Sequence, residues 1–585
     1  MQIDRQKQWQ FLEDELHAET ENFSVKFNSH ALHLLQETGE MFVAQFIKFK
    51  KGEMITMFPN TRGLPRKGDY LFSMILPEEL RNYHNWKDKT YRGLFNERFK
   101  GSEAVCIWHS PTEDKRFTLV GFRGFDIEFA EMVQDVPGLI LVFAPQRPPL
   151  EYVANLQKIV EDKASQQVSF LLDYNWLRKK YSPILIKNRK VSEFMLTQLT
   201  LTDTCILQGP PGTGKTTTIA EICHQLCKDG KSVMVTALTN RALMEIALKG
   251  ALKDEVQAGK VLKTNLTVDE MQECKGLVSL KKISPMPSSL VLSTYFIASS
   301  FAKEITSVCP FDYVIMDEAS QALLAMFAAA KKIGKVNLWV GDIKQMPPVV
   351  SLNSDRIKRS NYMGLVNGLD FITNNTEVPV YQMTETYRLT ERAASYTGIF
   401  YQNSLVAKNH ATVQPINMLG GLMKPEGGPA LILTDLRQGD YSPMLAVTLA
   451  ANIVCETLKE YPKMDIAVLS CMIRTVKALQ KAILSKTGTH NNLIIDTVAR
   501  IQGLTTDITV FVVPNVSYFY TLEKHLFNVA TSRSLERTII IADKNVFNYA
   551  PMDYEVREYL ERLSKECSVY LPFKSSKNLY IEKSE

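Results

Sequence analysis

The sequence predicts an α/β protein with two tandem domains built on parallel sheets and a mostly-β barrel domain at the N-terminus. The first observation is a glycine-rich loop at residues 209–216, which lies directly between a strand-like and a helix-like segment. The second is an alternation of short apolar strands with helical patterns, over residues 186–372 and again over 373–572. The third is the different character of residues 1–185, where alternating segments are joined by short turns.

Two hairpins are predicted in the N-terminal part of the chain. One pairs residues 41–49 with 54–58 across a Lys-Gly-Glu turn, and the other pairs residues 104–109 with 117–122. Several such strands close most naturally into a small barrel or sandwich. Residues 150–166 have helical spacing and lead toward the first α/β domain, whereas residues 573–585 are a polar tail.

Each α/β domain shows five short buried-strand patterns. In the first domain they are residues 206–208, 233–236, 290–293, 313–316 and 338–340. In the second domain they are residues 430–433, 466–469, 493–496, 508–513 and 538–542. Only the first domain carries the glycine-rich loop.

Composition favours a soluble protein of the cell interior. The chain has 585 residues, a net charge of +5 and average shares of hydrophobic and charged residues, which argues against extended disorder. The first residues are charged, and no apolar run reaches the roughly 18 residues of a membrane span, so we expect a cytoplasmic protein without membrane contact. The nine cysteines are scattered, and Cys223, His224 and Cys227 are interpreted as a helix face rather than a metal site.

The loop GPPGTGKT predicts a nucleoside triphosphate site. Glycines let the backbone amides wrap closely round a phosphate chain, and the helix that follows presents its positive end to the same anion. Lys215 is expected to reach the β- and γ-phosphates, and the Thr216 hydroxyl to ligate Mg²⁺. The nucleotide-binding residues predicted here are Gly209, Pro210, Pro211, Gly212, Thr213, Gly214, Lys215, Thr216 and Thr217.

An apolar strand at residues 313–316 ends in two acids. Asp317 at a strand end can hold Mg²⁺, and the neighbouring Glu318 can orient the water that attacks the γ-phosphate. A solvated acidic turn is the alternative, which the preceding phosphate loop makes less favoured.

These motifs resemble those of the superfamily 1B helicases, in particular the group of the nonsense-mediated-decay RNA helicase, senataxin and the immunoglobulin mu-binding helicase. The family's DEAxQ is matched by DEASQ at residues 317–321, and its GDxxQLPP by GDIKQMPP at residues 341–348. The resemblance implies two RecA-like domains, an accessory barrel, and Mg²⁺-dependent ATP hydrolysis that drives 5′ to 3′ travel on a single strand. It also implies that Gln345 senses the γ-phosphate.

The resemblance continues in the second α/β domain. Tyr387 and Arg388 are similar to the family's adenine-stacking tyrosine and γ-phosphate arginine. Residues 497–507 are similar to a motif that contributes Gln502 and Gly503 to the nucleotide site, and residues 528–533 supply a second arginine, Arg533. The family pattern therefore predicts two arginines that reach from the second domain to the phosphate loop.

Some positions depart from the family pattern. Thr505 stands where the family has a ribose-contacting glutamate, and Ala499 where it has an aspartate. Arg474 falls near the place of a family glutamine, and Gln198 lies too near the loop to match the adenine-reading glutamine. Sugar and base recognition are therefore left open by the sequence.

Polar residues at strand ends are predicted to contact nucleic acid through its phosphates. They are Thr239, Asn240, Arg241, Ser293, Thr294 and Thr497. Helix caps are the alternative role for such residues.

Residues 82–100 interleave aromatic and basic side chains. This pattern suits stacking on single-stranded bases, and it equally suits a helix that packs its aromatic face on the barrel.

The sequence thus predicts an ATP hydrolase, a helicase or translocase that acts as a monomer on single-stranded DNA or RNA. The alternative is an ATP-switched clamp or remodelling subunit that binds nucleic acid or a protein without unwinding. No group of residues typical of a nuclease is evident in the sequence.

Overall fold

The computed structural model describes most of the chain. The described residues are 4–60, 63–65, 69–113, 116–136, 138–146, 148, 150–163, 168–173, 182–266, 268–409, 413–415, 422–488, 490, 492–501 and 503–572. They form two compact units, one of residues 13–151 and one of residues 1–12 with 152–585. Each unit is described by itself.

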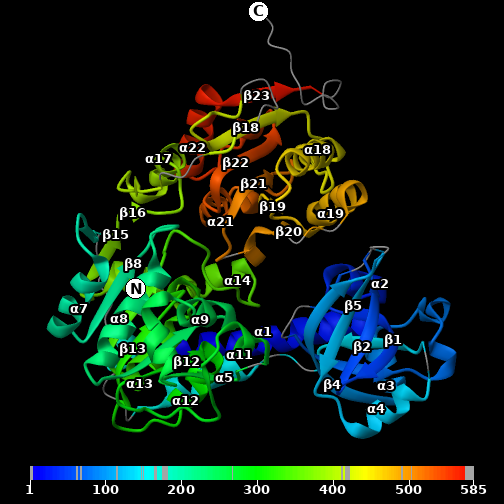
Figure 1. Ribbon diagram of the computed structural model, residues 1–585, viewed down its shortest axis with the longest axis horizontal. Coiled ribbons are helices and arrows are strands. Elements are labelled where there is room, and N and C mark those ends of the chain that lie inside the picture. The colour runs from blue at the N-terminus through cyan, green and yellow to red at the C-terminus, as the bar shows by residue number, and fades with distance from the viewer. Residues whose placement is uncertain are drawn as a thin grey trace, which may run out of the picture. The chain divides into compact units, whose positions relative to one another are not determined.

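The smaller unit is a closed six-stranded barrel, shown in blue and cyan in Figure 1. Its strands pair antiparallel in the order β1-β2-β5-β4-β3-β6, and β6 closes on β1. Their bounds are β1 Phe42–Lys50, β2 Glu53–Pro59, β3 Tyr70–Ile75, β4 Lys100–Pro111, β5 Phe117–Arg123 and β6 Ile140–Ala144. Both predicted hairpins are confirmed, because β1 pairs with β2 and β4 with β5.

Short helices cover the barrel, and they account for much of the aromatic stretch at residues 82–100. The helices of this unit are the part of α1 (Arg5–Ser29) from residue 13 onward, α2 Leu32–Thr38, α3 Tyr91–Glu97 and α4 Ile127–Gln134. Trp86 and Tyr91 are buried in one cluster with strand residues, and Arg98 lies over the rings of Phe72 and Phe95. Trp86 and Tyr91 therefore pack on the barrel, as the second alternative for this stretch predicts, whereas Phe99 is exposed.

The first α/β domain is a nine-stranded parallel sheet in the order β11-β10-β12-β9-β13-β14-β8-β15-β7. The strands are β7 Ile184–Ile186, β8 Thr204–Gln208, β9 Ser232–Ala237, β10 Val261–Thr264, β11 Val278–Leu280, β12 Ser289–Thr294, β13 Phe311–Met316, β14 Gly334–Gly341 and β15 Val380–Met383. The main helices are α7 Val191–Leu201, α8 Lys215–Lys228, α9 Asn240–Ala247, α11 Val268–Glu273, α12 Tyr295–Ala302, α13 Leu324–Ile333 and α16 Gly368–Asn375. All five predicted strands of this domain are present.

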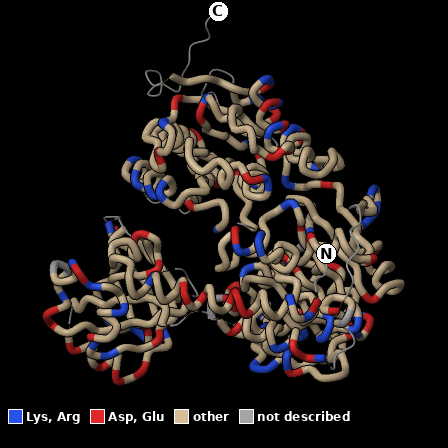
Figure 2. The backbone as a smooth tube through the Cα atoms, turned by 180° about the vertical axis from the view of Figure 1, so that it is seen from behind, with Lys and Arg blue, Asp and Glu red and all other residues tan. Residues whose placement is uncertain are grey.

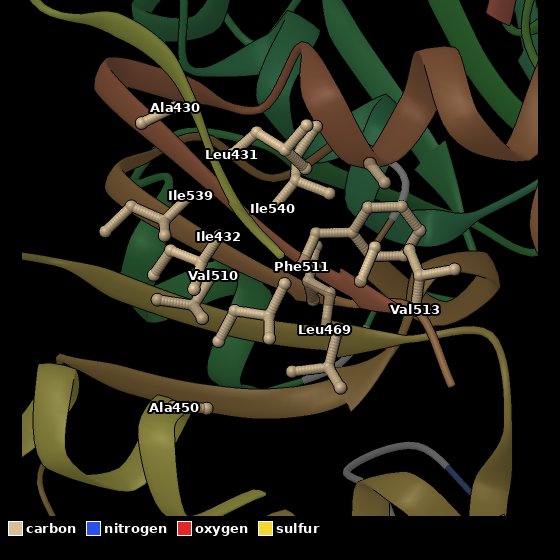
Figure 3. Packing of buried hydrophobic residues seen from close by; sticks show 14 of the residues in the cluster. Ala430, Leu431, Ile432, Ala450, Leu469, Val510, Phe511, Val513, Ile539 and Ile540 are labelled. Atoms are coloured by element: carbon tan, nitrogen blue, oxygen red, sulfur yellow. The ribbon is translucent and has the colours of Figure 1, made fainter. Parts of the chain in front are cut away.

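The second α/β domain is a six-stranded parallel sheet in the order β20-β19-β21-β22-β18-β23. The strands are β18 Gly428–Thr434, β19 Ile466–Ser470, β20 Leu493–Thr497, β21 Thr506–Val512, β22 Ser534–Asp543 and β23 Ser568–Leu571. Helices α17 Glu391–Thr397, α18 Met444–Glu460, α19 Ile473–Thr487, α21 Lys524–Thr531 and α22 Tyr554–Glu566 surround it. Figure 3 shows the core, where Ile432, Phe511 and Ile540 come from neighbouring strands. The predicted fold class, two tandem parallel-sheet domains and a barrel, is confirmed.

The smaller compact unit ends at Glu151, and the first sheet continues past residue 372. The barrel unit ends at Glu151, since helix α5 (Glu151–Glu161) packs on the first α/β domain through a hydrogen bond from Lys303 Nζ to Asn155 Oδ1 (2.9 Å). The first sheet begins at β7 and continues past residue 372, because β15 pairs with both β8 and β7. The polar tail from residue 573 lies outside the described residues.

No helix among the described residues is long and apolar enough to cross a membrane. Basic and acidic residues alternate along the backbone of both units (Figure 2).

We expect the core of the second domain to depend on Phe511. This ring is buried in the cluster, so Phe511→Ala should lower the free energy that protects β21 and β22 amides from hydrogen exchange by about 3–5 kcal/mol. Phe519 is the matched control because its ring is 74% exposed, and Phe519→Ala should change this free energy by less than about 0.5 kcal/mol. Equal losses in the two variants would contradict this packing.

Candidate nucleotide site

The site lies where four loops meet at the carboxyl edge of the first sheet. Strands β13, β14, β8 and β15 are neighbours in that order, and all run parallel. Their following loops therefore emerge side by side, as is typical of ligand sites in open α/β sheets. These loops contain the glycine-rich segment, the acid pair at residues 317–318, residues 342–348 and residues 384–388.

The glycine-rich loop has a conformation that requires its glycines. Gly212 and Gly214 have positive φ angles of 71° and 83°. A Cβ atom on Gly209 would lie 2.3 Å from Cγ of Lys215, so this side chain can fold back over the loop only because residue 209 is glycine. Helix α8 begins at Lys215, directly after the loop, and its amino end faces the loop. This is the strand, loop and helix arrangement that suits phosphate.

Lys215 lies among charges of both signs. Its Nζ donates to the carbonyl oxygens of Gly209 (2.6 Å) and Pro210 (3.5 Å). Burial lowers the pKa of Lys215, Asp342 and Asp317 oppose that shift, and two arginines, Arg388 and Arg533, add to it. The structure therefore brings the predicted lysine, acids and arginines into one electrostatic environment.

The two acids after β13 are held in a low-dielectric position. Asp317 is 4% exposed, and burial raises its pKa to about 6. Burial and the adjacent Asp317 raise the pKa of Glu318 to about 8. Glu318 also has a left-handed backbone with φ of 53°, and its Oε2 is buried without a hydrogen-bond partner among the described residues. A strained, unpartnered acid beside a second carboxylate is what a cation or a reacting water would satisfy.

Arg388 is attached to the glycine-rich loop, which the sequence did not predict. The Thr386 hydroxyl donates to Pro211 O (2.9 Å), and the Tyr387 amide donates to Gly212 O (2.8 Å). A Cβ on Gly212 would lie 2.3 Å from Cβ of Arg388. Arg388 therefore sits with the first domain through β15, and the prediction that it reaches over from the second domain is corrected.

Arg533 comes from the second domain, two residues after helix α21. It is 2% exposed, its Nε donates to Val529 O (3.0 Å), and its Nη1 donates to Leu504 O (3.4 Å). Its Nη2 is buried and has no hydrogen-bond partner among the described residues. Burial and the nearby Arg388 lower the pKa of Arg533 to about 9.

The two arginines approach each other closely. Arg388 Nη1 donates to the carbonyl oxygen of Ser532, the residue before Arg533 (3.3 Å). Burial lowers the pKa of Arg388 to about 10. Within the described part of the chain neither guanidinium forms an ion pair with a carboxylate. Two buried like charges without a directly paired carboxylate suit an anion.

Gln345 is held by the neighbouring Asp342. Its Nε2 donates to Asp342 Oδ2 (2.9 Å), and that carboxylate also accepts hydrogen bonds from Gln208, Tyr401 and the amide of Lys344. Asp342 belongs to the GDIKQMPP motif, but Gln208, Tyr401 and Asn528 were not singled out from the sequence. Tyr401 carries no motif signal at all, since its partner lies 59 residues away.

The other predicted nucleotide residues surround this centre. Thr216 is half-buried at the second position of α8, and Thr217 is exposed at the third. Tyr387 is 60% exposed, so its ring is free to stack on a base. Gly503 has φ of 89° and directly precedes Leu504, whose carbonyl holds Arg533. Gln502 lies outside the described residues.

Three of the residues predicted to contact nucleic acid form hydrogen bonds or ion pairs with other residues of the protein. Thr239 caps helix α9 by accepting from the Ala242 amide (3.2 Å), which fits the alternative that it is a helix cap. Asn240 Oδ1 accepts from Lys263 Nζ (2.8 Å), and Arg241 pairs with Glu245 and Glu273.

The remaining predicted contacts differ in how accessible they are. Ser293 is fully buried and accepts from the Thr264 hydroxyl (3.1 Å), so its prediction as a phosphate contact is corrected. The reason is that β12 continues through Thr294, which places Ser293 inside the sheet between β9 and β10. Thr294 is half-buried at the start of α12, and Thr497, at the end of β20, is 9% exposed.

Comparisons with known proteins agree with this site. Residues 194–351 match a family model described as an AAA domain. The chain is 29% identical over 215 residues to the "DNA replication ATP-dependent helicase/nuclease DNA2" of Saccharomyces cerevisiae, a match that covers 36% of this chain and 14% of that protein. The protein of the same name from Schizosaccharomyces pombe is 25% identical over 400 residues, which cover 61% of this chain and 28% of that protein.

Among solved structures, "Crystal structure of Arterivirus nonstructural protein 10 (helicase)" aligns with a TM-score of 0.36 and 12% identity over 88% of this chain and 80% of that chain. The matches to the two yeast proteins span only 14% and 28% of the lengths of those proteins. The chain is thus similar, over these regions, to an AAA domain and to two helicase/nucleases, and neither match tests the narrower resemblance to the nonsense-mediated-decay and senataxin group.

Proposed function

We propose that this protein is an ATP-dependent helicase or translocase that moves 5′ to 3′ along single-stranded nucleic acid. The observation that carries the proposal is the pair of buried guanidinium groups, Arg388 and Arg533, beside the phosphate loop and its Lys215. Three cations around a glycine-rich loop suit the β- and γ-phosphates of a triphosphate. The arginines meet from two domains, so the cleft can couple nucleotide turnover to domain movement.

The residues divide the work of hydrolysis. The loop amides and Lys215 bind the phosphate chain, and Glu318 orients the attacking water and accepts its proton. Burial and Asp317 raise the pKa of Glu318, which strengthens this carboxylate as a base once it is deprotonated, and Lys215 and Arg533 favour that deprotonated form. Arg388 and Arg533 stabilise the charge that develops on the transferred phosphoryl group.

The acid pair also fits a divalent cation. Asp317 and Thr216 would hold Mg²⁺, and the buried Oε2 of Glu318, which has no hydrogen-bond partner among the described residues, would accept a hydrogen bond from a bound water. When bound, the ion neutralises phosphate charge during transfer. Tyr295 fixes the strand end on which Asp317 sits by donating its hydroxyl to Asp317 O (2.6 Å).

Single-stranded DNA is the substrate that the relatives favour. Their printed names describe DNA replication helicase/nucleases, and we carry only the helicase activity to this chain. Of the predicted contacts, Asn240, Arg241 and Thr294 remain as candidates for phosphate contacts at the carboxyl edge of the first sheet.

An ATP-switched clamp remains the second candidate function. Thr505 is exposed at the position where the family has an acid, and Arg474 stacks on Tyr441 (5.3 Å to the ring centroid) near the place of a family glutamine. These departures lie in the second domain, on which travel along a strand depends.

We expect ATP hydrolysis stimulated by single strands to require Lys215 and Glu318. Lys215→Ala removes a phosphate ligand and Glu318→Gln removes the base, so each should lower kcat roughly hundredfold or more. Chelation of divalent cations should have the same effect. Lys228→Ala is the matched control, because this exposed lysine lies at the far end of the same helix and should leave kcat unchanged. Turnover that is identical with and without nucleic acid would reject the proposal.

Strand displacement separates the helicase from the clamp. Duplexes with a 5′ or a 3′ single-stranded tail, in DNA and in RNA, are incubated with the wild-type chain and ATP. Displacement from the 5′-tailed duplex alone is the expected result. Hydrolysis without displacement on either tail would instead favour the clamp.

A further inference from the structure

Residues 342–346, here termed the sensor loop, belong to the first domain and pack on the second domain. Residues 342–346 follow β14, yet Met346 is buried in the hydrophobic cluster of the second sheet, together with Phe400 and Phe527. Gln321 Nε2, in the first domain, donates a hydrogen bond to the carbonyl oxygen of Met346 (2.5 Å). The loop that carries Gln345 is thus packed against both domains.

The carboxylate of Asp342 is fully used. Oδ1 accepts from Gln208 Nε2 (2.6 Å) and from the Lys344 amide (3.0 Å), and Oδ2 accepts from Gln345 Nε2 (2.9 Å) and the Tyr401 hydroxyl (2.7 Å). A carboxylate offers about four acceptor positions, and this one is 2% exposed. Gln345 therefore shares its acceptor atom with a tyrosine of the second domain.

The Tyr401 hydroxyl is also an acceptor, and its donor leads to the arginines. Asn528 Nδ2, on helix α21, donates to the Tyr401 hydroxyl (2.8 Å) and to Lys344 O (2.8 Å). The backbone oxygen of Asn528 accepts from the Ser532 hydroxyl (2.6 Å). Ser532 O accepts from Arg388, and Arg533 is the next residue.

We propose that Tyr401 and Asn528 are positioning residues that link the movement of Gln345 to the placement of Arg533. The inference rests on the proposed function, since it needs a nucleotide whose γ-phosphate draws Gln345 away from Asp342. The hydrogen-bonded series Gln345, Asp342, Tyr401, Asn528 is here termed the sensor relay. Hydrogen bonds in such a series polarise one another, so a change at one end is felt at the other.

Tyr401 lowers the free-energy cost of releasing Gln345 from Asp342. When Gln345 turns to the nucleotide, Oδ2 of the buried Asp342 keeps the Tyr401 hydroxyl as its donor. Without that hydroxyl, release would leave a buried charged acceptor atom unpaired, which is strongly unfavourable. In a chain that lacks the hydroxyl, nucleotide still binds through the loop amides and Lys215, but Gln345 stays on Asp342 and the transition state is reached less often.

The test compares two tyrosines that lose the same group. Tyr401→Phe removes the relay hydroxyl, and Tyr396→Phe removes the hydroxyl of another buried tyrosine, which donates to the partly exposed Glu566 (2.7 Å to Oε2) away from the site. ATP hydrolysis by the full chain is measured with an oligo(dT) strand present. Tyr401→Phe should lower kcat roughly tenfold or more with KM for ATP within about threefold of wild type. Tyr396→Phe should keep kcat within about twofold.

The kinetic result overturns the inference if both variants behave alike, or if Tyr401→Phe raises KM and leaves kcat unchanged. Asn528→Ala gives a second check through a double variant. Because both side chains act in one series, the Tyr401→Phe/Asn528→Ala chain should lose hardly more kcat than the worse single variant. Losses that multiply would show that the two residues act separately.

A binding measurement keeps the inference separate from the proposed function. A non-hydrolysable ATP analogue with Mg²⁺ should change hydrogen exchange of the α21 amides in the wild type and in Tyr396→Phe, but not in Tyr401→Phe. If the wild type binds the analogue without hydrolysing ATP, the proposed function fails while this exchange experiment still decides the relay. An identical exchange response in all three chains would overturn it.

Discussion

Two buried guanidinium groups that form no ion pair with a carboxylate among the described residues are the constraint on which the rest of the site depends. Burial lowers the pKa of both arginines, and the nearby Arg388 lowers that of Arg533 further. The carbonyl oxygens that accept hydrogen bonds from them compensate only in part. Burial of an unpaired charge is unfavourable, so holding these two groups in place lowers the stability of the folded chain. The glycine-rich loop, the acid pair and the sensor loop are arranged around this positive centre.

The parallel sheet explains why residues so distant in sequence meet there. Loops after β13, β14, β8 and β15 share one edge because the strands are neighbours and run in one direction. The loop from 209 to 214 and the segment from 384 to 388 are separated by about 170 residues, yet Thr386 donates directly to Pro211. The order of the strands, rather than any single contact, sets the composition of the site.

Local patterns could be predicted from the sequence, and contacts over long separations could not. The glycine-rich loop and the buried strands were recognisable because apolar runs and turn residues are short-range signals. Strands β7, β10, β11, β15 and β23 were missed, since each is at most four residues long and joins its sheet through pairing with strands distant in sequence. Ser293 was misjudged by one position, because β12 ends at Thr294 and everything before it lies within the sheet. Tyr401 had no signal, since its importance comes from Asp342 and Asn528 alone.

The attachment of Arg388 to the first sheet places the two arginines on opposite sides of the boundary between the α/β domains. Because Thr386 and Tyr387 fix this segment to the phosphate loop, Arg388 stays with the first domain while Arg533 travels with α21. The two cations therefore repel each other across the boundary between the domains, and an anion placed between them reverses the sign of that interaction. On the proposed function, an anion between the two guanidinium groups would hold the domains together more tightly than the Arg388–Ser532 hydrogen bond alone.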